Sequence, residues 1–267
     1  MAQQTSLWLT RTPDTQRFPK LSENLSADVV VVGGGIAGVS AAYFLARAGK
    51  KVVLLEANHL GTGESGFTTA FLTSSVDSPL TQLRERFGDA HIRQVRETGE
   101  ETIQLVERLV AEETVSAGFR RLDALAIGLT PDAVPHLQRE ADALRAAGGD
   151  PILLDDKEVR AIGLHAAGAL RIPQQGAFDV RAFLLGLAEC VQRHGGQIFE
   201  GSRMTGLVSG TTTTVNTAAG TVTADAVVLA TGLFPPPYRI QNQLFRPIVT
   251  YVIALKHGET ANGWRLP

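Results

Sequence analysis

The segment DVVVVGGGIAGVS (28–40) runs an apolar stretch directly into three consecutive glycines, and it constrains the fold more than any other part of the chain. Val29–Val32 predicts a strand of a parallel sheet that is covered on both faces. Gly33, Gly35 and Gly38 fit G-x-G-x-x-G between this strand and an Ala- and Leu-rich helix. In this pattern the first glycine makes a tight turn, the second lets the backbone approach a pyrophosphate, and the third lets helix and strand pack closely. Because the helix N-terminus also offers N–H groups to an anion, the segment predicts a dinucleotide-binding turn.

A carboxylate follows the second strand of this unit. The run KVVLLE (51–56) predicts a buried strand that ends at Glu56, about 20 residues after the first glycine of the motif. An acid at this offset binds the ribose hydroxyls of a dinucleotide. It would repel a 2′-phosphate, so NADP is disfavoured. The motif by itself does not distinguish FAD from NAD.

The composition argues against several classes of function. The 267 residues carry 25 basic and 27 acidic side chains, a formal net charge of −2. Nucleic acid is therefore not an expected partner, because such partners require a basic surface. Cys190 is the single cysteine, so we expect no internal disulfide and no iron–sulfur or zinc cluster held by this chain. No run approaches the roughly 20 apolar residues of a membrane span, and we expect a soluble, cytoplasmic protein with no metal site.

The rest of the sequence predicts a discontinuous architecture. Residues 1–27 are polar, and we interpret them as an N-terminal arm. After residue 70 the pattern changes to amphipathic helices around one half-buried strand, FRRLDALAIGL (119–129). From residue 176 the α/β pattern returns with these elements: a helix at Val180–His194, a strand at Gln197–Glu200, Thr-rich short strands, and a buried strand at Ala224–Gly232.

Two further segments match a known family. The loop GTGESGFTTA (61–70) carries Gly61, Gly63, Ser65 and Gly66 in a G-x-G-x-S-G-like pattern, and ADAVVLATG ends in a turn of small residues, Ala230–Gly232. This arrangement resembles the FAD-dependent oxidoreductases of the D-amino-acid oxidase and glycine oxidase superfamily. The continuation TTA (68–70) and the segments LWL, FRRLDAL and GALRIPQQGAFD resemble the subset that often carries a C-terminal Rieske domain.

The resemblance implies an α/β fold. We expect a Rossmann-like parallel FAD-binding sheet of the glutathione-reductase type, formed by residues 28–70 and 176–232. An α+β substrate domain would be inserted into it, formed by residues 71–175 and 233–267. The cofactor implied is FAD.

The resemblance also assigns residues to the cofactor. The loop after the second strand would lie along the pyrophosphate and flavin, and Met204 would meet the adenine through its backbone, where the family usually has valine. The expected cofactor-binding residues are Gly33, Gly35, Ile36, Ala37, Gly38, Glu56, Ala57, Gly63, Ser65, Thr68, Thr69, Ala70, Met204, Ala230, Thr231 and Gly232. Phe67 stands where relatives often have histidine, so no histidyl–flavin link is expected there. The single cysteine cannot ligate a Rieske cluster, which takes two Cys and two His.

No catalytic residue follows from the sequence. Full members of the superfamily continue well beyond the equivalent of Pro267, so we expect a C-terminally truncated chain without the groups that fix the substrate carboxylate. The remaining candidates are His165, His194, Arg171, Arg246 and Tyr251. Each has a structural alternative, such as a histidine at a helix C-terminus or an arginine paired with an acid.

Three hypotheses remain open. In the first, the chain is part of a flavoenzyme that oxidises an amine or amino acid by hydride transfer to FAD. In the second, it is a catalytically incomplete nucleotide-binding scaffold or half of a split enzyme, with a partner chain or a second copy covering the missing half. The third, an NAD-dependent dehydrogenase, ranks last because it would not need the loop 61–70.

Overall fold

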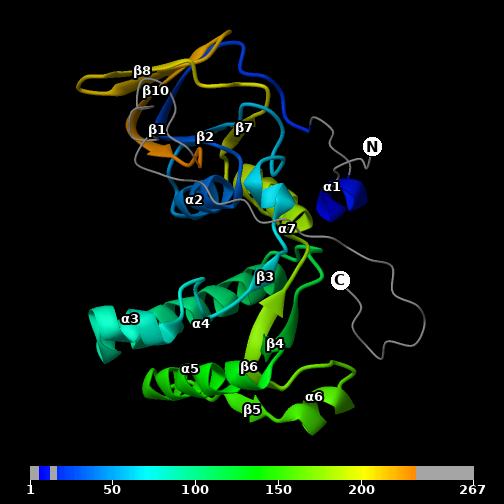
Figure 1. Ribbon diagram of the computed structural model, residues 1–267. Helices are drawn as coiled ribbons and strands as arrows, with labels where there is room; N and C mark the ends of the chain where they lie inside the picture. The colour runs from blue at the N-terminus through cyan, green and yellow to red at the C-terminus, as the bar shows by residue number, and fades with distance from the viewer. Residues whose placement is uncertain (1–5, 13–16, 233–267) are drawn as a thin grey trace. The chain divides into compact units, whose positions relative to one another are not determined.

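A computed structural model describes residues 6–12 and 17–232 of the chain (Figure 1). The described residues divide into two compact units. The first unit consists of the described residues within Met1–Thr69, Glu113–Ala117 and Asp179–Tyr251. The second consists of the described residues within Ala70–Glu112 and Gly118–Phe178.

A six-stranded sheet forms the first unit, in the order β7-β2-β1-β10-β9-β8. Its strands are β1 (Asn24–Val32), β2 (Val52–Leu55), β7 (Gln197–Phe199), β8 (Gly206–Ser209), β9 (Thr213–Asn216) and β10 (Thr221–Leu229). The pairs β1–β2, β1–β10 and β2–β7 are parallel, whereas β9 and β8 add an antiparallel hairpin beside β10. The predicted α/β fold is confirmed, with a mixed sheet in place of a wholly parallel one.

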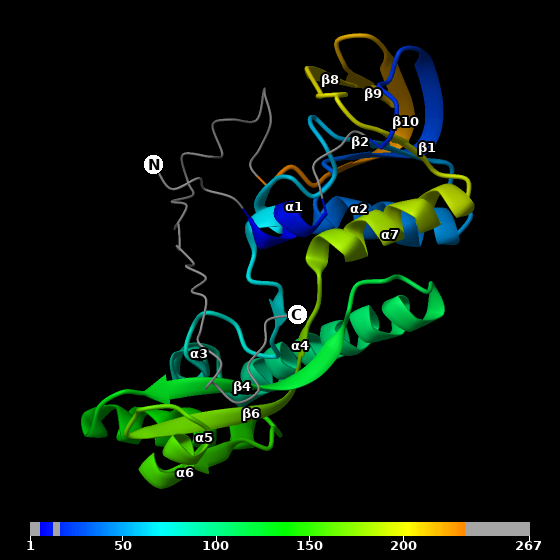
Figure 2. The same ribbon diagram turned by 90° about the vertical axis from the view of Figure 1, so that its right-hand side faces the viewer.

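Apolar strands and two helices build the core of this unit. Val30, Val32 and Val53 belong to one buried cluster. The helices α2 (Ile36–Arg47) and α7 (Val180–Arg193) lie side by side on the same face of the sheet (Figures 1 and 2). Two short helices, α1 (Leu7–Arg11) and the 3-10 turn η1 (Glu64–Phe67), complete the described part of the unit.

The first strand is longer than the valine run predicts. It begins at Asn24, within the segment that the sequence suggests is an arm. The reason is long-range pairing, because Leu25 lies opposite Val222 and Ala27 lies opposite Ala224 of β10. Both Leu25 and Ala27 also pack against the buried cluster.

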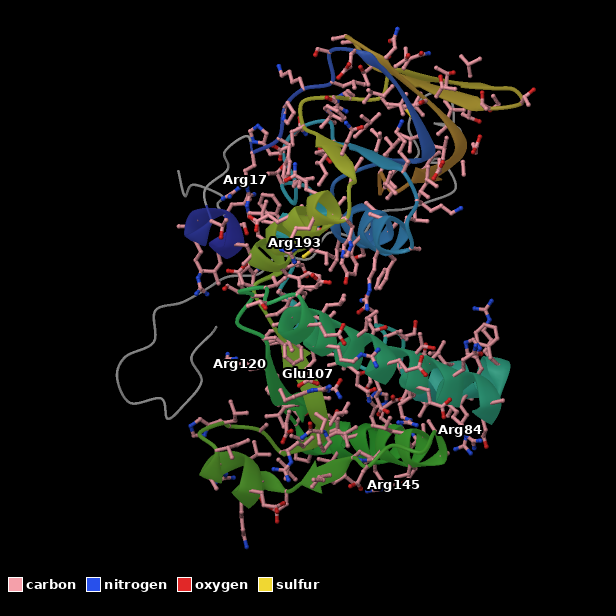
Figure 3. All side chains as sticks on the ribbon, turned by 180° about the vertical axis from the view of Figure 1, so that it is seen from behind. Arg17, Arg84, Glu107, Arg120, Arg145 and Arg193 are labelled. Atoms are coloured by element: carbon pink, nitrogen blue, oxygen red, sulfur yellow. The ribbon has the colours of Figure 1, made fainter. Side chains whose placement is uncertain are left out.

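The second unit combines an antiparallel sheet with amphipathic helices. Its strands are β3 (Phe71–Leu72), β4 (Arg120–Gly128), β5 (Ile152–Leu154) and β6 (Gly168–Ala177), and its helices are α3 (Leu80–Phe87), α4 (Asp89–Glu112), η2 (Pro131–Ala133), α5 (Val134–Ala146) and α6 (Asp156–Ala161). Strand β6 pairs with the other three. Leu80, Ile92 and Leu144 join α3, α4 and α5 in one buried cluster. Glu107 on α4, labelled in Figure 3, forms an ion pair of 2.6 Å with Arg121 on β4.

Strand β6 was not predicted from the sequence, because Pro173 lies within it and proline is normally excluded from a central strand. The structure accommodates this proline at an irregularity of the β4–β6 ladder, between Leu122 and Ala124. Gln174 there adopts a left-handed φ of 61°. The proline therefore lies where the ladder is already interrupted.

None of the helices in residues 6–12 and 17–232 combines the length and the apolar character needed to cross a membrane.

Candidate functional site

The glycine turn after β1 is shaped by backbone that leaves no room for side chains. Gly33 has a φ of 115°, and a Cβ there would lie 2.3 Å from the carbonyl oxygen of Ala230. A Cβ on Gly38 would lie 1.9 Å from the carbonyl oxygen of Gly33. A Cβ on Gly35, in contrast, would meet only the hydroxyl of Ser65, at 3.1 Å. The first and third glycines are thus required by packing, as the motif predicts.

The N-terminus of α2 presents backbone donors beside this turn. The N–H of Ile36 donates to Oγ of Ser65 at 3.0 Å. For the N–H groups of Ala37 and Gly38, no acceptor is found among the described residues. The first turn of a helix carries such donors at the positive end of the helix dipole. This arrangement suits an anionic group.

Glu56 connects the end of β2 to the same turn. Its Oε2 accepts from the N–H of Gly34 at 2.6 Å, and its Oε1 accepts from the N–H of Asn58 at 2.7 Å. Each carboxylate oxygen can accept about two hydrogen bonds, so capacity remains for hydroxyl donors. Glu56 therefore shapes the glycine turn and still offers acceptors beside it, with Ala57 next in the chain.

The loop after β2 folds back onto the turn. The N–H of Gly61 donates to the carbonyl of Gly34 at 3.0 Å, and Ser65 reaches α2 as described. A Cβ on Gly63 would meet no protein atom within 4 Å of the described structure. Gly63 thus borders open space, while its neighbours Gly61 and Ser65 hold the loop in place.

The end of β10 meets the glycine turn from the other side. The N–H of Ala230 donates to the carbonyl of Val32 at 2.8 Å, and Gly232 has a left-handed φ of 72°. Because β1 and β10 are parallel neighbours, their carboxyl ends place Ala230 and Thr231 beside Gly33. Met204 lies elsewhere in this unit, in the segment of chain that follows β7 and precedes β8, and it belongs to the buried cluster of Val30, Val32 and Val53.

The residues Thr68–Ala70 span the boundary between the two units. Thr68 and Thr69 are exposed in the first unit. Ala70 begins the second unit, is buried, and has a φ of 57°, a conformation that costs an L-residue about 1 kcal/mol.

A polar network, which sequence analysis missed, joins α2 to α7. The hydroxyl of Tyr43 donates to Glu113 at 2.6 Å, and Arg193, labelled in Figure 3, forms an ion pair with the same carboxylate at 2.7 Å. The hydrogen bond from Tyr43, together with Arg193, lowers the pKa of Glu113. Burial raises the pKa of Tyr43, and the bond to Glu113 adds to this rise. Burial also raises the pKa of the adjacent Cys190 to about 11, so its thiol is a poor nucleophile.

Glu200 is a second acid whose role sequence analysis missed. The residue is 1% exposed, and its carboxylate accepts the N–H groups of Arg17, Phe18 and Leu60 at 2.7, 3.1 and 2.8 Å. Like Glu56, it directly follows a parallel strand. The position of an acid directly after a predicted strand is visible in the sequence, and it could have identified Glu200. Glu200 holds the loop just before Gly61, so it supports the candidate site indirectly.

The catalytic candidates fall in different parts of the chain, with His194 in the first unit and His165 and Arg171 in the second. His194 caps α7, with its ring centroid 6.0 Å from that of Tyr43. Arg171 in the second unit lies 3.8 Å from Asp123, a structural ion pair. Arg246 and Tyr251 lie outside the described residues.

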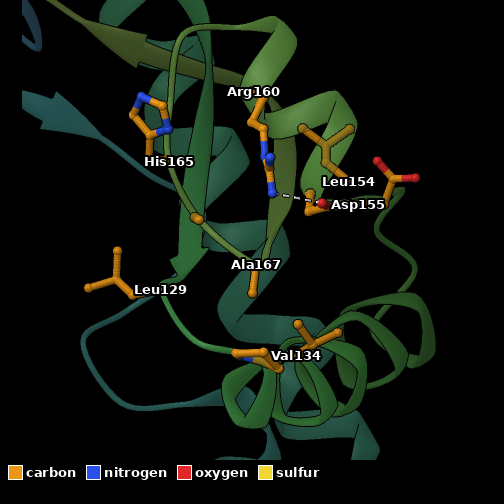
Figure 4. A pocket seen from close by; sticks show the side chains of 10 residues that line it. Leu129, Val134, Leu154, Asp155, Arg160, His165 and Ala167 are labelled. Atoms are coloured by element: carbon orange, nitrogen blue, oxygen red, sulfur yellow. Dashed lines mark hydrogen bonds and ion pairs between the residues drawn. The ribbon is translucent and has the colours of Figure 1, made fainter.

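His165 lines a pocket of the second unit (Figure 4). The pocket has a volume of about 840 Å³ and includes Leu129, Val134, Leu154, Asp155 and Arg160 in its wall. Arg160 is paired with Asp156 at 3.0 Å. None of the expected cofactor residues lines this pocket.

Known proteins are similar to this chain in sequence. The chain is 32% identical over 193 residues to a putative Rieske 2Fe-2S iron–sulfur protein of Bacillus subtilis, covering 72% of this chain and 37% of that one. It is 28% identical to gamma-glutamylputrescine oxidoreductase of Escherichia coli, covering 80% of this chain and 50% of that one. The chain thus spans half or less of the length of these two relatives.

Solved structures show the same fold. Glycine oxidase of Geobacillus kaustophilus superposes with a TM-score of 0.63 at 23% identity, over 78% of this chain and 56% of that one. An L-amino acid deaminase of Proteus myxofaciens superposes with a TM-score of 0.66 at 18% identity, over 81% of this chain and 48% of that one.

The family model for FAD-dependent oxidoreductases matches residues 28–267, which include the glycine turn, Glu56 and residues of both units. The donors and spaces beside Gly33 fit a dinucleotide of this kind, since bare backbone, open N–H groups and a carboxylate converge there. The chain belongs to the family of FAD-dependent oxidoreductases.

Proposed function

We propose that the first unit binds FAD at the carboxyl ends of β1, β2 and β10. Glu56 would accept the ribose hydroxyls, and the N–H groups of Ala37 and Gly38 would face the pyrophosphate. The observation that carries this assignment is the combination of open donors at the start of α2 with a carboxylate tied to the same turn. Gly63 supports it, because a cofactor can approach the backbone where no side chain intervenes.

The remaining expected contacts complete this proposal. Thr68–Ala70 would continue along the cofactor toward the flavin, with Ala230–Gly232 on the other side of the turn. Met204 would contribute backbone only, since its side chain is buried in the core. Its N–H has no hydrogen-bond acceptor among the described residues, which leaves it available to the adenine.

We infer that the whole protein oxidises an amine or an amino acid. The relatives and neighbours named above include an oxidoreductase of gamma-glutamylputrescine and a glycine oxidase, which supports this substrate class. When bound, FAD supplies the acceptor for the hydride that leaves the substrate C–N bond. The residues of this chain hold and orient that acceptor and keep the glycine turn rigid. We also propose that the protein acts in the cytoplasm, in contact with a partner chain or a second copy of itself.

The first test is the absorption spectrum of the purified 267-residue chain, with the mass of any ligand released on denaturation. We expect flavin absorption, or uptake of added FAD, and no comparable binding of NAD. A colourless chain that takes up no added FAD would overturn the proposal.

The second test addresses Glu56. Glu56→Gln should raise the Kd for FAD by about 10-fold or more, since hydrogen bonds to a charged acceptor contribute roughly 1.5–3 kcal/mol. Glu23→Gln is the matched control, because Glu23 is an exposed acid just before β1, at the opposite end of that strand from the glycine turn. Equal affinity of the two variants for FAD would contradict the ribose assignment.

A further inference from the structure

Helix α1, near the N-terminus, packs against the cofactor loop. In Figures 1 and 2 this helix lies beside the N-terminal end of α7, and it also contacts η1. Trp8 is the buried residue of α1, with 4% of its side chain exposed. A Cβ on Gly66 would approach the side chain of Leu9 at 3.6 Å, so α1 and η1 are in close contact.

Two side chains of this segment donate to the loop backbone. The indole Nε1–H of Trp8 donates to the carbonyl of Thr68 at 2.7 Å. The hydroxyl of Ser6 donates to the carbonyl of Gly66. Ser6 is itself fixed as the N-cap of α1, where its Oγ accepts the N–H of Trp8 at 3.1 Å. Two carbonyls of one short loop therefore accept hydrogen bonds from side chains of one helical segment.

The bond from Trp8 determines the direction of the next amide. In a planar trans peptide the C=O and the following N–H point in opposite directions. With the Thr68 carbonyl turned toward Trp8, the N–H of Thr69 points away from α1. Thr69 is exposed, and its N–H has no acceptor among the described residues. This amide is thus oriented and available to a hydrogen-bond acceptor.

We propose that Trp8 is a positioning residue for the cofactor, acting through the Thr68–Thr69 peptide. It presents the Thr69 N–H to an acceptor atom of FAD, and Ser6 supports it by holding the Gly66 carbonyl. This inference rests on the proposed FAD function. A packing role alone would require the aromatic ring of Trp8 and not its N–H.

The test compares Trp8→Phe with wild type in the full chain. Phenylalanine retains an aromatic ring for packing and removes the donor to Thr68. Leu7→Ala is the matched control, because Leu7 lies on the same helix and is 41% exposed. We would measure the Kd for FAD, the visible spectrum of the bound flavin, and hydrogen exchange of the 66–70 amides without FAD.

We expect Trp8→Phe to raise the Kd for FAD about 5- to 10-fold, the effect of losing one hydrogen bond. The flavin spectrum should shift, and the loop amides should exchange faster, whereas Leu7→Ala should leave all three unchanged. An unaltered Kd and spectrum in Trp8→Phe would overturn the inference, even if thermal stability fell. Absence of FAD binding by wild type would instead overturn the proposed function itself, and this inference with it. If Trp8→Phe does not fold, Ser6→Ala is judged by the same criteria.

Discussion

Replacing Glu200 by glutamine tests how far one buried carboxylate organises the first unit. The carboxylate accepts three backbone N–H groups, two on Oε2 and one on Oε1. Glutamine has the same shape but only one oxygen. Its best orientation keeps the oxygen on Arg17 and Phe18 and turns its NH₂ toward the N–H of Leu60.

The magnitude follows from this geometry. Losing the bond to Leu60 removes a charge-assisted hydrogen bond of about 1.5–3 kcal/mol and leaves a buried donor unsatisfied. The two retained bonds weaken by about 1 kcal/mol each, because their acceptor becomes neutral. Relief of the desolvation of a buried charge offsets part of the loss. We therefore expect the free energy of unfolding of the first unit to fall by about 3 kcal/mol, a large share of the roughly 5–15 kcal/mol typical of a domain.

The assay is urea unfolding followed by the fluorescence of Trp8, which is buried in the first unit. The chain has two tryptophans, so the Trp264→Phe background leaves Trp8 as the only reporter. Glu23→Gln in the same background is the control and should change the free energy by less than about 0.5 kcal/mol. If Glu200→Gln unfolds at the same urea concentration and with the same slope as this control, the assigned role of Glu200 is wrong.

Four further predictions concern the same unit. Glu113→Gln should destabilise the chain at pH 7 and much less near pH 3, because the hydrogen bond from Tyr43 lowers the pKa of Glu113. The contribution is complete above the unfolded pKa of about 4.3 and is lost as the pH falls through the lower folded value; urea unfolding at both pH values checks this, and an equal loss at both would contradict it. Gly33→Ala should prevent stable folding, as judged by soluble yield and circular dichroism, because its Cβ would overlap a backbone carbonyl at 2.3 Å. Gly63→Ala should preserve stability within about 0.5 kcal/mol and weaken FAD binding in a titration, whereas unchanged binding would show that the cofactor does not approach Gly63. Cys190 should resist a thiol reagent at pH 8 in the folded chain and react fully in denaturant, because burial raises its pKa to about 11; rapid labelling of the folded chain would refute this.

The central βαβ unit could be predicted from local sequence. A backbone preference or a burial pattern is indicated within a few residues by each of three features: the four valines, the G-x-G-x-x-G turn and the terminal Glu56. The contacts of Gly33 and Gly38 show why the pattern is so restrictive. A side chain at Gly33 would overlap the carbonyl of Ala230 after β10, and one at Gly38 would overlap the carbonyl of Gly33. The family and its cofactor followed from this segment and the loop after it.

Strand β6 shows where local patterns were misleading. Pro173 argues against a strand, and only the irregular pairing with β4 makes room for it. The amphipathic helical pattern after residue 70 divides at Gly88, whose φ of 83° separates α3 from α4. The strand depends on a partner that a local window of sequence does not contain, whereas a glycine that ends a helix is a local signal.

The sequence by itself determined the glycine turn, the family and the acid that follows β2, because these depend on residues close together in the chain. Only the tertiary structure decided that Glu200 accepts amides from residues 17, 18 and 60, that Glu113 meets Tyr43, and that Trp8 holds the carbonyl of Thr68. Their partners lie 60 or more positions away. The residue type determines how many hydrogen bonds a side chain can form, but the packing of distant segments determines which groups form them.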